Sequence, residues 1–213
     1  MTLRELKAYY SREKTVIRGR LKEFELVYSD TDRRIFEELC FCIFTANASA
    51  RMGLTCIELI RPALMTGSPA ELSRRIKGHY RFWRVRPKYI VHTREYLKET
   101  CGLKMKELIN SFGNNREALR DFFAAGKNIK GIGYKEASHF LRNIGFKGYA
   151  ILDKHILNCL CEYGIINCVE PMNTKKKYIE VEEKMKKFAG RIGLDFDELD
   201  LLFWSSKTGE VLK

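Results

Sequence analysis

The spacing of apolar residues constrains the fold of this chain more than any other feature of its sequence. Apolar side chains recur every three or four residues along nearly all of the 213 residues, as at Ile17, Leu21 and Phe24. This spacing matches the turn of an α-helix, whereas the alternation typical of a half-buried strand is almost absent. We therefore predict an all-α protein of about ten helices joined by short loops.

Side chains that cap helix ends mark where several of these helices begin. Ser68 is followed by Pro69, which suits the first position of a helix. Asp30 or Thr31 precedes one apolar helical stretch, and Asp195 precedes the last one. The sequence predicts a helix after each of these caps.

The charge of the chain indicates a polyanionic partner. It holds 39 Lys and Arg against 27 Asp and Glu, a formal net charge of +12. Such an excess favours nucleic acid first and an anionic membrane surface second, and it excludes an acidic solvating chain. No apolar run approaches the ~18 residues of a membrane span, and the N-terminus has no signal-peptide pattern. We expect an intracellular protein.

Two lysine runs, at 175–177 and 184–187, look at first like a basic binding patch. They alternate with Glu180, Glu182 and Glu183. Opposite charges at this spacing are typical of a solvated helix face, so we predict that these residues face water.

The cysteines and histidines do not form a metal-binding pattern. Seven cysteines without a signal peptide favour reduced thiols over a disulfide framework. Cys159, Cys161 and Cys168 have a spacing unlike that of zinc or iron–sulfur sites, and the four histidines are scattered. We predict no metal ion and no organic cofactor.

The most informative stretch is NIKGIGYKEASHFLRN at 128–143. Gly131 and Gly133 allow a tight turn between two helices, and its uncovered N–H groups suit a phosphate without reading bases. Lys135 follows in the first turn of the second helix, where the helix dipole disfavours a positive charge. A neutral amine is what a Schiff-base nucleophile requires, although an exposed lysine that contacts phosphate fits the same spacing.

A second chemical group follows the short apolar run that ends at Asp153. The helix beginning near His155 makes Asp153 a natural N-cap. A carboxylate held by helix N–H groups stays ionised, and it is then suited to stabilise a positive charge that develops on a sugar.

GIGYK at 131–135, followed by LDKH at 152–155, resembles the helix-hairpin-helix, glycine/proline-Asp superfamily of DNA glycosylases. Nearly the whole chain is similar to the short 8-oxoguanine DNA glycosylase/lyases of archaea and some bacteria. The stretches that carry this similarity are 40–47, 81–84, 131–143 and the tail 199–213, which ends in TGEVLK. The chain departs from the superfamily at Lys130, where Pro is frequent, and it lacks the four-cysteine loop of endonuclease III-like members.

The resemblance implies roles for individual residues. Lys135 matches the nucleophile that attacks C1′ of the damaged nucleotide, and Asp153 matches the carboxylate that activates the amine and steadies the sugar's charge. Gly131 and Gly133 match the phosphate clamp. These residues imply a bifunctional enzyme that releases the base and nicks the strand by β-elimination.

The resemblance also implies residues around the lesion and the base. Asn47 matches a polar residue inserted opposite the lesion, and Arg81 and Phe82 match residues at the lesion. Trp204 and the carboxylate of Lys213 match the base pocket, where a carboxylate accepts the N7–H that guanine lacks. Arg84 and Arg51 are further candidates for DNA contacts. The spacing of Phe82, Trp83 and Trp204 fits buried core residues as well.

We expect two helical subdomains with the active site in the cleft between them. Residues 31–149 form one and end in the hairpin, while 1–30 plus 150–213 form the other and carry Asp153 and the tail. The expected partner is double-stranded DNA containing oxidised guanine, bound by a monomer without an obligate protein partner in a prokaryotic cytoplasm. Two alternatives remain open: a glycosylase for another lesion, and a non-catalytic hairpin module that only binds DNA.

Overall fold

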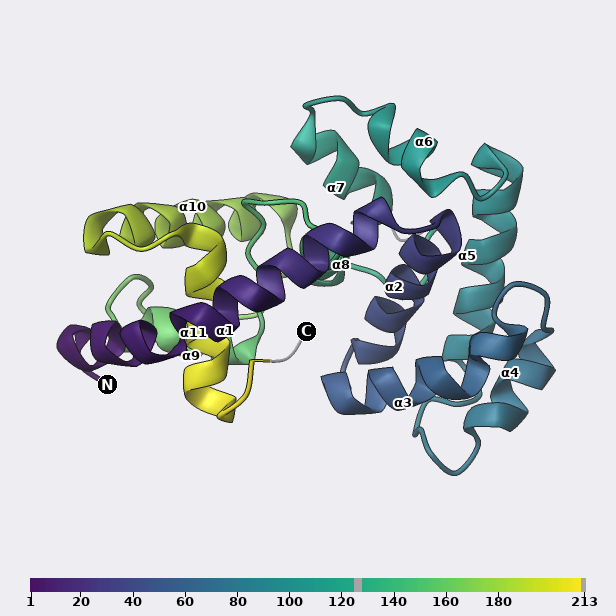
Figure 1. The fold of residues 1–213 in the computed structure, drawn as a ribbon, viewed down its shortest axis with the longest axis horizontal. Coiled ribbons are helices and arrows are strands. Elements are labelled where there is room, and N and C mark those ends of the chain that lie inside the picture. The colour runs from purple at the N-terminus through teal and green to yellow at the C-terminus, as the bar shows by residue number, and fades with distance from the viewer. Residues whose placement is uncertain (125–127, 212–213) are drawn as a thin grey trace.

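A computed structural model describes residues 1–124 and 128–211, and in these residues it consists of helices and loops without a strand. This confirms the predicted all-α class. The helices are α1 (Leu3–Ser29), α2 (Asp32–Thr45), α3 (Ala50–Ile60), the 3₁₀ turn η1 (Arg61–Ala63), α4 (Pro69–Ile76), α5 (Arg86–Cys101), α6 (Met105–Asn110), α7 (Arg116–Ala124), α8 (Tyr134–Asn143), α9 (Lys154–Glu162), α10 (Lys175–Ile192) and α11 (Phe196–Thr208) (Figure 1). Among the described residues, no helix combines the length and apolar character needed to cross a membrane.

The predicted caps are where the helices begin. Ser68 accepts a hydrogen bond from the backbone of Glu71 at the start of α4, and Asp195 accepts two at the start of α11. Of the two candidates before α2, Thr31 is the cap, because its hydroxyl accepts from Arg34 N at 3.2 Å. Each cap satisfies N–H groups that have no partner within the helix.

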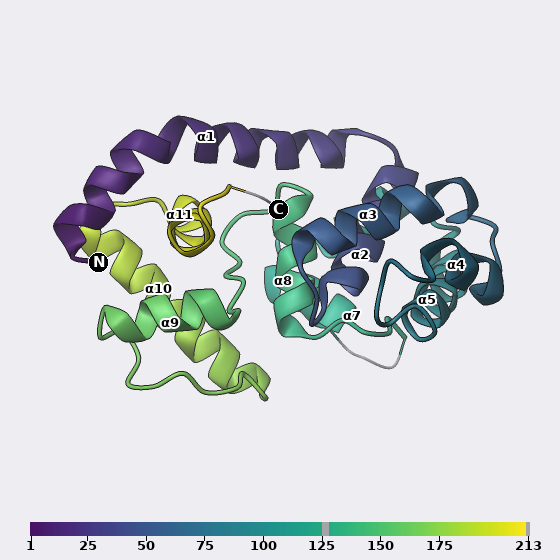
Figure 2. The same ribbon diagram turned by 90° about the horizontal axis from the view of Figure 1, so that it is seen from below.

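The buried apolar side chains form two clusters, one toward each end of the molecule. The first takes its side chains mainly from α2 to α8, and the second from α1 and from α9 to α11. The two clusters divide between Tyr149 and Ala150, while α1 runs along both and buries Ile17 in the second and Val27 in the first (Figure 2). This division supports the two expected subdomains, whose boundaries stay a proposal.

Two buried ion pairs connect helices of the two clusters. Arg120 on α7 lies 2.8 Å from Glu182 on α10, and Arg142 on α8 lies 2.7 Å from Asp200 on α11. All four side chains are at most 5% exposed. Charges in such surroundings are stable only as pairs, so these contacts fix how the two halves meet.

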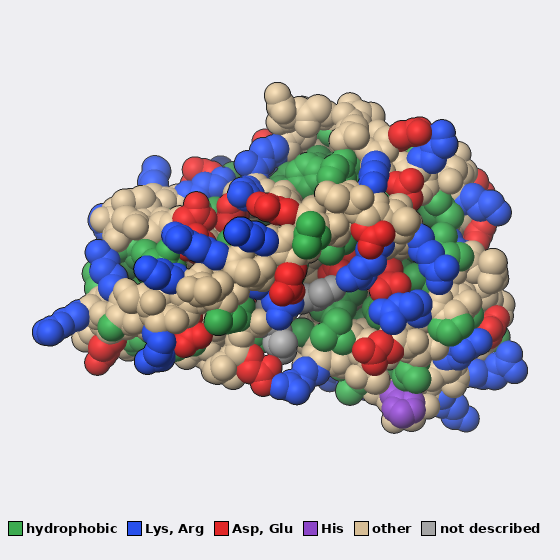
Figure 3. All heavy atoms as spheres, viewed as in Figure 1, with side chains coloured by type: hydrophobic (Ala, Val, Ile, Leu, Met, Phe, Trp, Pro, Cys, Tyr) green, Lys and Arg blue, Asp and Glu red, His purple; other side chains and the backbone are tan. Residues whose placement is uncertain are grey.

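The expectation for the charged face of α10 is wrong at Glu182. Its side chain is 3% exposed because it pairs with Arg120. Its neighbours do lie outside: Lys184 pairs with Glu180 and Lys186 with Glu183, both at 2.7 Å. Figure 3 shows acidic and basic side chains interspersed over this part of the surface.

Candidate active site

The segment that leads to Asp153 is extended, and side chains from the second cluster hold its backbone. Glu182 accepts the N–H of Ala150 at 2.8 Å, and Asp200 accepts the N–H of Ile151 at 3.1 Å. These are the same carboxylates that form the two buried ion pairs. The position of Asp153 is therefore tied to the junction between the clusters.

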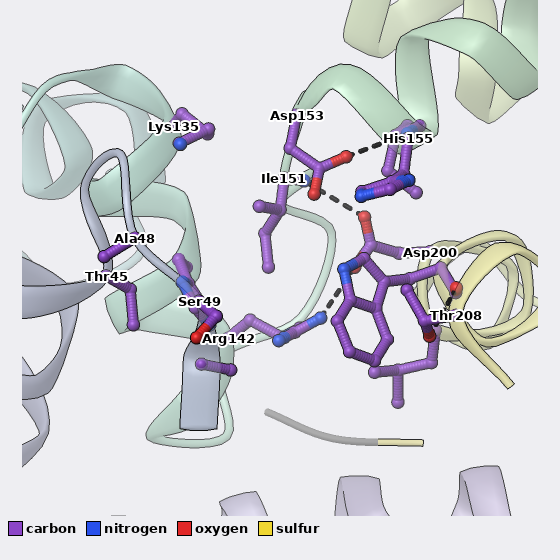
Figure 4. Close-up of a pocket in the computed structure, with 15 residues that line it drawn as sticks. Thr45, Ala48, Ser49, Lys135, Arg142, Ile151, Asp153, His155, Asp200 and Thr208 are labelled. Carbon is purple, nitrogen blue, oxygen red and sulfur yellow. Dashed lines mark hydrogen bonds and ion pairs between the residues drawn. The ribbon is translucent and has the colours of Figure 1, made fainter. Parts of the chain in front are cut away.

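Asp153 caps α9, as the sequence predicts. Its Oδ1 accepts a hydrogen bond from the backbone of Ile156 at 2.8 Å, and the side chain remains half-buried. The rest of the carboxylate borders a cavity of about 330 Å³ (Figure 4).

Lys135 borders the same cavity from the opposite side. It lies in the first turn of α8, half-buried, with 32% of its side chain exposed. Its Nζ is 3.0 Å from Oε1 of Glu136, and Figure 4 shows the amine turned away from Asp153. The cavity therefore has an amine from the first cluster on one wall and a carboxylate from the second on another. Trp204 of α11 also lines it.

Several polar residues of this cavity were not singled out from the sequence. They include Ser49, His139, Arg142, His155 and Asp200. Burial raises the pKa of Asp200 to about 6, although Arg142 and the N–H of Ile151 favour its ionised form. The available signal was a carboxylate interrupting the apolar run of α11.

Replacing Asp200 with Ala is expected to destabilise the protein by about 3 kcal/mol, because it leaves a buried Arg142 without its partner. Equilibrium urea unfolding measures the free energy of unfolding. The control is Asp195→Asn, which keeps a helix cap at the start of the same α11. An Asp200→Ala protein as stable as this control would show that the ion pair does not hold the two halves together.

A second cavity, of about 680 Å³, brings together four other predicted site residues. Gly131 and Gly133 of the hairpin line it, together with Asn47 and Phe82. Asn47 is exposed in the turn between α2 and α3, with φ of 60°. The turn between α2 and α3 and the loop before α5 are far apart in sequence, and both line this cavity with the hairpin.

The predicted arginines differ in their placement. Arg81 donates to the backbone carbonyl of Asn47, and its guanidinium lies 4.4 Å from the centre of the Phe82 ring. Arg84 is exposed and packs on Trp83 at 4.1 Å, outside both cavities.

Arg86 also lines the second cavity, although the sequence does not mark it as a site residue. It is buried, and it donates to the carbonyl of Ala46 at 3.0 Å and to that of Gly131 at 3.4 Å. This side chain therefore ties the turn between α2 and α3 to the hairpin. Its position in the RFWRVR run gave no signal that separated it from the exposed arginines.

The hairpin requires glycine at position 131. Gly131 has φ of +77°, and a Cβ there would lie 2.5 Å from Nη1 of Arg86 and 2.8 Å from the Tyr89 ring. Gly131→Ala is expected to cost about 2 kcal/mol of stability from the left-handed backbone and the clash together. Thermal unfolding measures this loss. Gly190→Ala on α10, where a Cβ meets open space, should be neutral or stabilising, and equal losses in the two variants would contradict the account.

Lys213, which the resemblance places in the base pocket, lies outside the described residues. The described tail reaches the cleft nonetheless: Glu210, just after α11, forms an ion pair with Arg51 of α3. Arg51, a weaker candidate for a DNA contact, is thus placed beside the tail.

Comparison with known proteins identifies relatives over the full span of the site. The family model Ogg-HhH, described as 8-oxoguanine DNA glycosylase, matches residues 17–194. A protein of Korarchaeum cryptofilum named 8-oxoguanine DNA glycosylase/AP lyase is 40% identical over 205 residues, covering 95% of this chain and 93% of its own length. A protein of Methanocaldococcus jannaschii with the same name is also 40% identical, with coverage of 95% and 94%.

Solved structures of proteins with similar names share the fold of this chain. The Methanocaldococcus jannaschii 8-oxoguanine glycosylase/lyase in complex with a 15mer DNA containing 8-oxoguanine superposes with a TM-score of 0.89 at 37% identity, covering 99% of both chains. The 8-oxoguanine DNA glycosylase of Thermotoga maritima gives a TM-score of 0.87 at 34% identity, with coverage of 99% and 98%.

Proposed function

This chain belongs to the Ogg-HhH family of 8-oxoguanine DNA glycosylases, and we propose that it excises 8-oxoguanine from double-stranded DNA and then nicks the strand as an abasic-site lyase. The two relatives described above carry both activities in their names, and each matches 95% of this chain. The observation that carries the assignment is the cavity between the two core clusters, which has Lys135 on one wall and Asp153 on another.

Lys135 acts as the nucleophile. Its neutral amine attacks C1′ of the damaged nucleotide, the bond from C1′ to the base breaks, and the base leaves with the bonding electrons and takes up a proton. Loss of a proton from the new amine and opening of the sugar give a Schiff base. Removal of a proton from C2′ then expels the 3′ phosphate, and hydrolysis frees Lys135.

Asp153 supplies negative charge where the sugar becomes positive. Its carboxylate is held in place by the first turn of α9, so it needs no reorganisation during the reaction. Glu182 and Asp200 hold the backbone of the extended segment before Asp153. This keeps Asp153 on the wall of the first cavity that faces α8.

The second cavity binds the DNA around the lesion. Gly131 and Gly133 present N–H groups to a phosphate, while Asn47 and Phe82 fill the space left by the extruded base. Arg81 and Arg84 attract the DNA backbone. Arg81 contacts both Asn47 and Phe82. This assignment is supported by the shared cavity of Asn47, Phe82, Gly131 and Gly133.

Trp204 stacks on the extruded base in the first cavity, and the carboxylate of Lys213 accepts its N7–H. Trp204→Ala is expected to lower 8-oxoguanine release about five-fold or more, since base–aromatic stacking contributes about 1–3 kcal/mol. Cleavage of a ready-made abasic site should persist, because it has no base to recognise. Trp83→Ala, outside both cavities, is the control, and equal losses on both substrates would remove Trp204 from base recognition.

The two alternatives are separated by one assay on matched duplexes. Release of base is measured from duplexes that hold 8-oxoguanine, guanine or another oxidised base at one position. The proposal predicts preferential release of 8-oxoguanine. Preferential release of a different base would favour a glycosylase for that lesion, and tight binding without release of any base would favour the non-catalytic module.

The relative solved with DNA supports DNA as the partner of this chain. We further propose that the enzyme works as a monomer on the nucleoid DNA of a prokaryotic cytoplasm. Support comes from the placement of Lys135 and Asp153, since one chain supplies both walls of the cavity.

A further inference from the structure

The carboxylate of Glu136 lies between the hairpin and the amine of Lys135. Its Oε2 accepts the N–H of Gly133 at 3.2 Å, and its Oε1 lies 3.0 Å from Nζ of Lys135. The side chain is only 14% exposed, and it borders the second cavity together with Gly131. One carboxylate thus contacts both the backbone assigned to phosphate and the side chain assigned to catalysis.

We propose that Glu136 is a positioning residue that holds Lys135 away from the reaction in the DNA-free protein, and that a DNA phosphate at the hairpin releases the amine by displacing this carboxylate. The proposal rests on the proposed function, because it assigns Lys135 as nucleophile and the hairpin as phosphate site. It adds a coupling between them: the nucleophile becomes available when the duplex is seated.

Glu136 and a DNA phosphate compete for one anion site at the hairpin. The N-terminus of α8 offers N–H groups without partners inside the helix, and it attracts negative charge. In the DNA-free structure the carboxylate of Glu136 occupies the N–H of Gly133. A phosphate needs the same donor, and it repels a carboxylate at contact distance. Seating the phosphate therefore moves Glu136 out of its position.

The same displacement frees the amine of Lys135. In the DNA-free structure Lys135 pairs with Glu136 and points away from Asp153 (Figure 4). An ammonium group in an ion pair is not a nucleophile. Once Glu136 moves, the flexible side chain of Lys135 loses this partner and turns into the first cavity toward C1′. There the carboxylate of Asp153 takes up a proton from the ammonium group and leaves the neutral amine that attacks.

Helix capping alone is the simpler explanation for this glutamate. A glutamate at the third helical position often accepts the N–H of the cap residue, as Glu136 does for Gly133. Capping does not explain the contact with Lys135. It also predicts that loss of the carboxylate weakens the hairpin, whereas the proposal predicts tighter DNA binding.

The first measurement is the affinity for a duplex with a single tetrahydrofuran abasic analogue, which has no base to release. Glu136→Gln keeps an acceptor for Gly133 but removes the charge, so it should bind about five-fold more tightly than the wild type. Glu183→Gln on α10 removes the same charge outside both cavities, and it should change the affinity less than about two-fold. Glu136→Asp keeps the charge and should bind no more tightly than the wild type.

The second measurement follows Lys135 without DNA. Reductive methylation by formaldehyde and cyanoborohydride, read by peptide mass spectrometry, should modify Lys135 about three-fold faster in Glu136→Gln than in the wild type, because the ion pair is lost. Lys130 of the same hairpin is the internal reference and should not change.

The proposal is overturned if Glu136→Gln binds no more tightly than Glu183→Gln, if Glu136→Asp gains affinity, or if the methylation rate of Lys135 stays at the wild-type value. Unfolding does not mimic the expected result, since an unfolded variant loses affinity. Neither measurement involves base release, so a failure here is distinct from a failure of the glycosylase assignment.

Discussion

Replacing Lys135 with Gln is expected to abolish base release and strand cleavage at 8-oxoguanine while the protein still binds the duplex. The amide of Gln has no nucleophilic nitrogen, so neither the Schiff base nor the elimination that follows from it can form. Single-turnover assays on a labelled duplex should show a loss of at least about 10⁴-fold. Binding should weaken only modestly, with the salt dependence reduced by about one phosphate contact.

Lys130→Gln is the matched control for this prediction. It removes the same charge from the same hairpin, on a residue that borders only the second cavity. This variant should lose some affinity for DNA and keep its chemistry. Equal loss of cleavage in both variants would mean that Lys135 contributes a phosphate contact, as the non-catalytic module requires.

Replacing Asp153 with Asn should separate its structural role from its chemical one. Asn is as good a helix cap as Asp, so α9 and the stability of the protein should be preserved. The negative charge that faces the sugar is lost, and the rate of base release should fall about a thousand-fold, the upper range for removing one stabilising group at a transition state. The measurement is the single-turnover rate of 8-oxoguanine release, with thermal unfolding alongside.

Asp195→Asn provides the same exchange at the cap of α11, where the side chain accepts from Asp197 and Glu198 and borders neither cavity. Its rate should equal that of the wild type. A wild-type rate in Asp153→Asn as well would leave Asp153 as a cap alone.

The sequence predicted those features of the fold that depend on neighbouring residues. Helical spacing and the caps at Ser68, Thr31 and Asp153 are local, because the capping side chain and its N–H partner lie within three residues. The all-α class followed from these signals and is confirmed by the structure.

Features that depend on distant partners were not predicted. Glu182 looked like part of a solvated face because its partner, Arg120, is 62 residues away. Asp200 gave only a weak signal, since Arg142 is 58 residues away. Arg86 is buried because it donates to the carbonyls of Ala46 and Gly131, which are 40 and 45 residues away. Periodicity reports which face of a helix is apolar, but it does not report which buried charges find each other.

The candidate site was predicted unevenly for the same reason. The hairpin glycines, Lys135 and Asp153 carry a sequence pattern, and their roles came from the resemblance to a known superfamily. The contact of Glu136 with both the hairpin and Lys135 became visible only in three dimensions, because neighbouring helical positions do not by themselves indicate a shared ion pair.

The most direct test of the central claim is covalent trapping by borohydride on a duplex with one 8-oxoguanine. The reductant converts a Schiff base into a stable amine, and peptide mass spectrometry then locates the DNA on the protein. If Lys135 is the nucleophile, an adduct forms on its Nζ in the wild type and in Lys130→Gln, and none forms in Lys135→Gln. Base release without an adduct, or an adduct on another amine, would contradict Lys135 as the nucleophile.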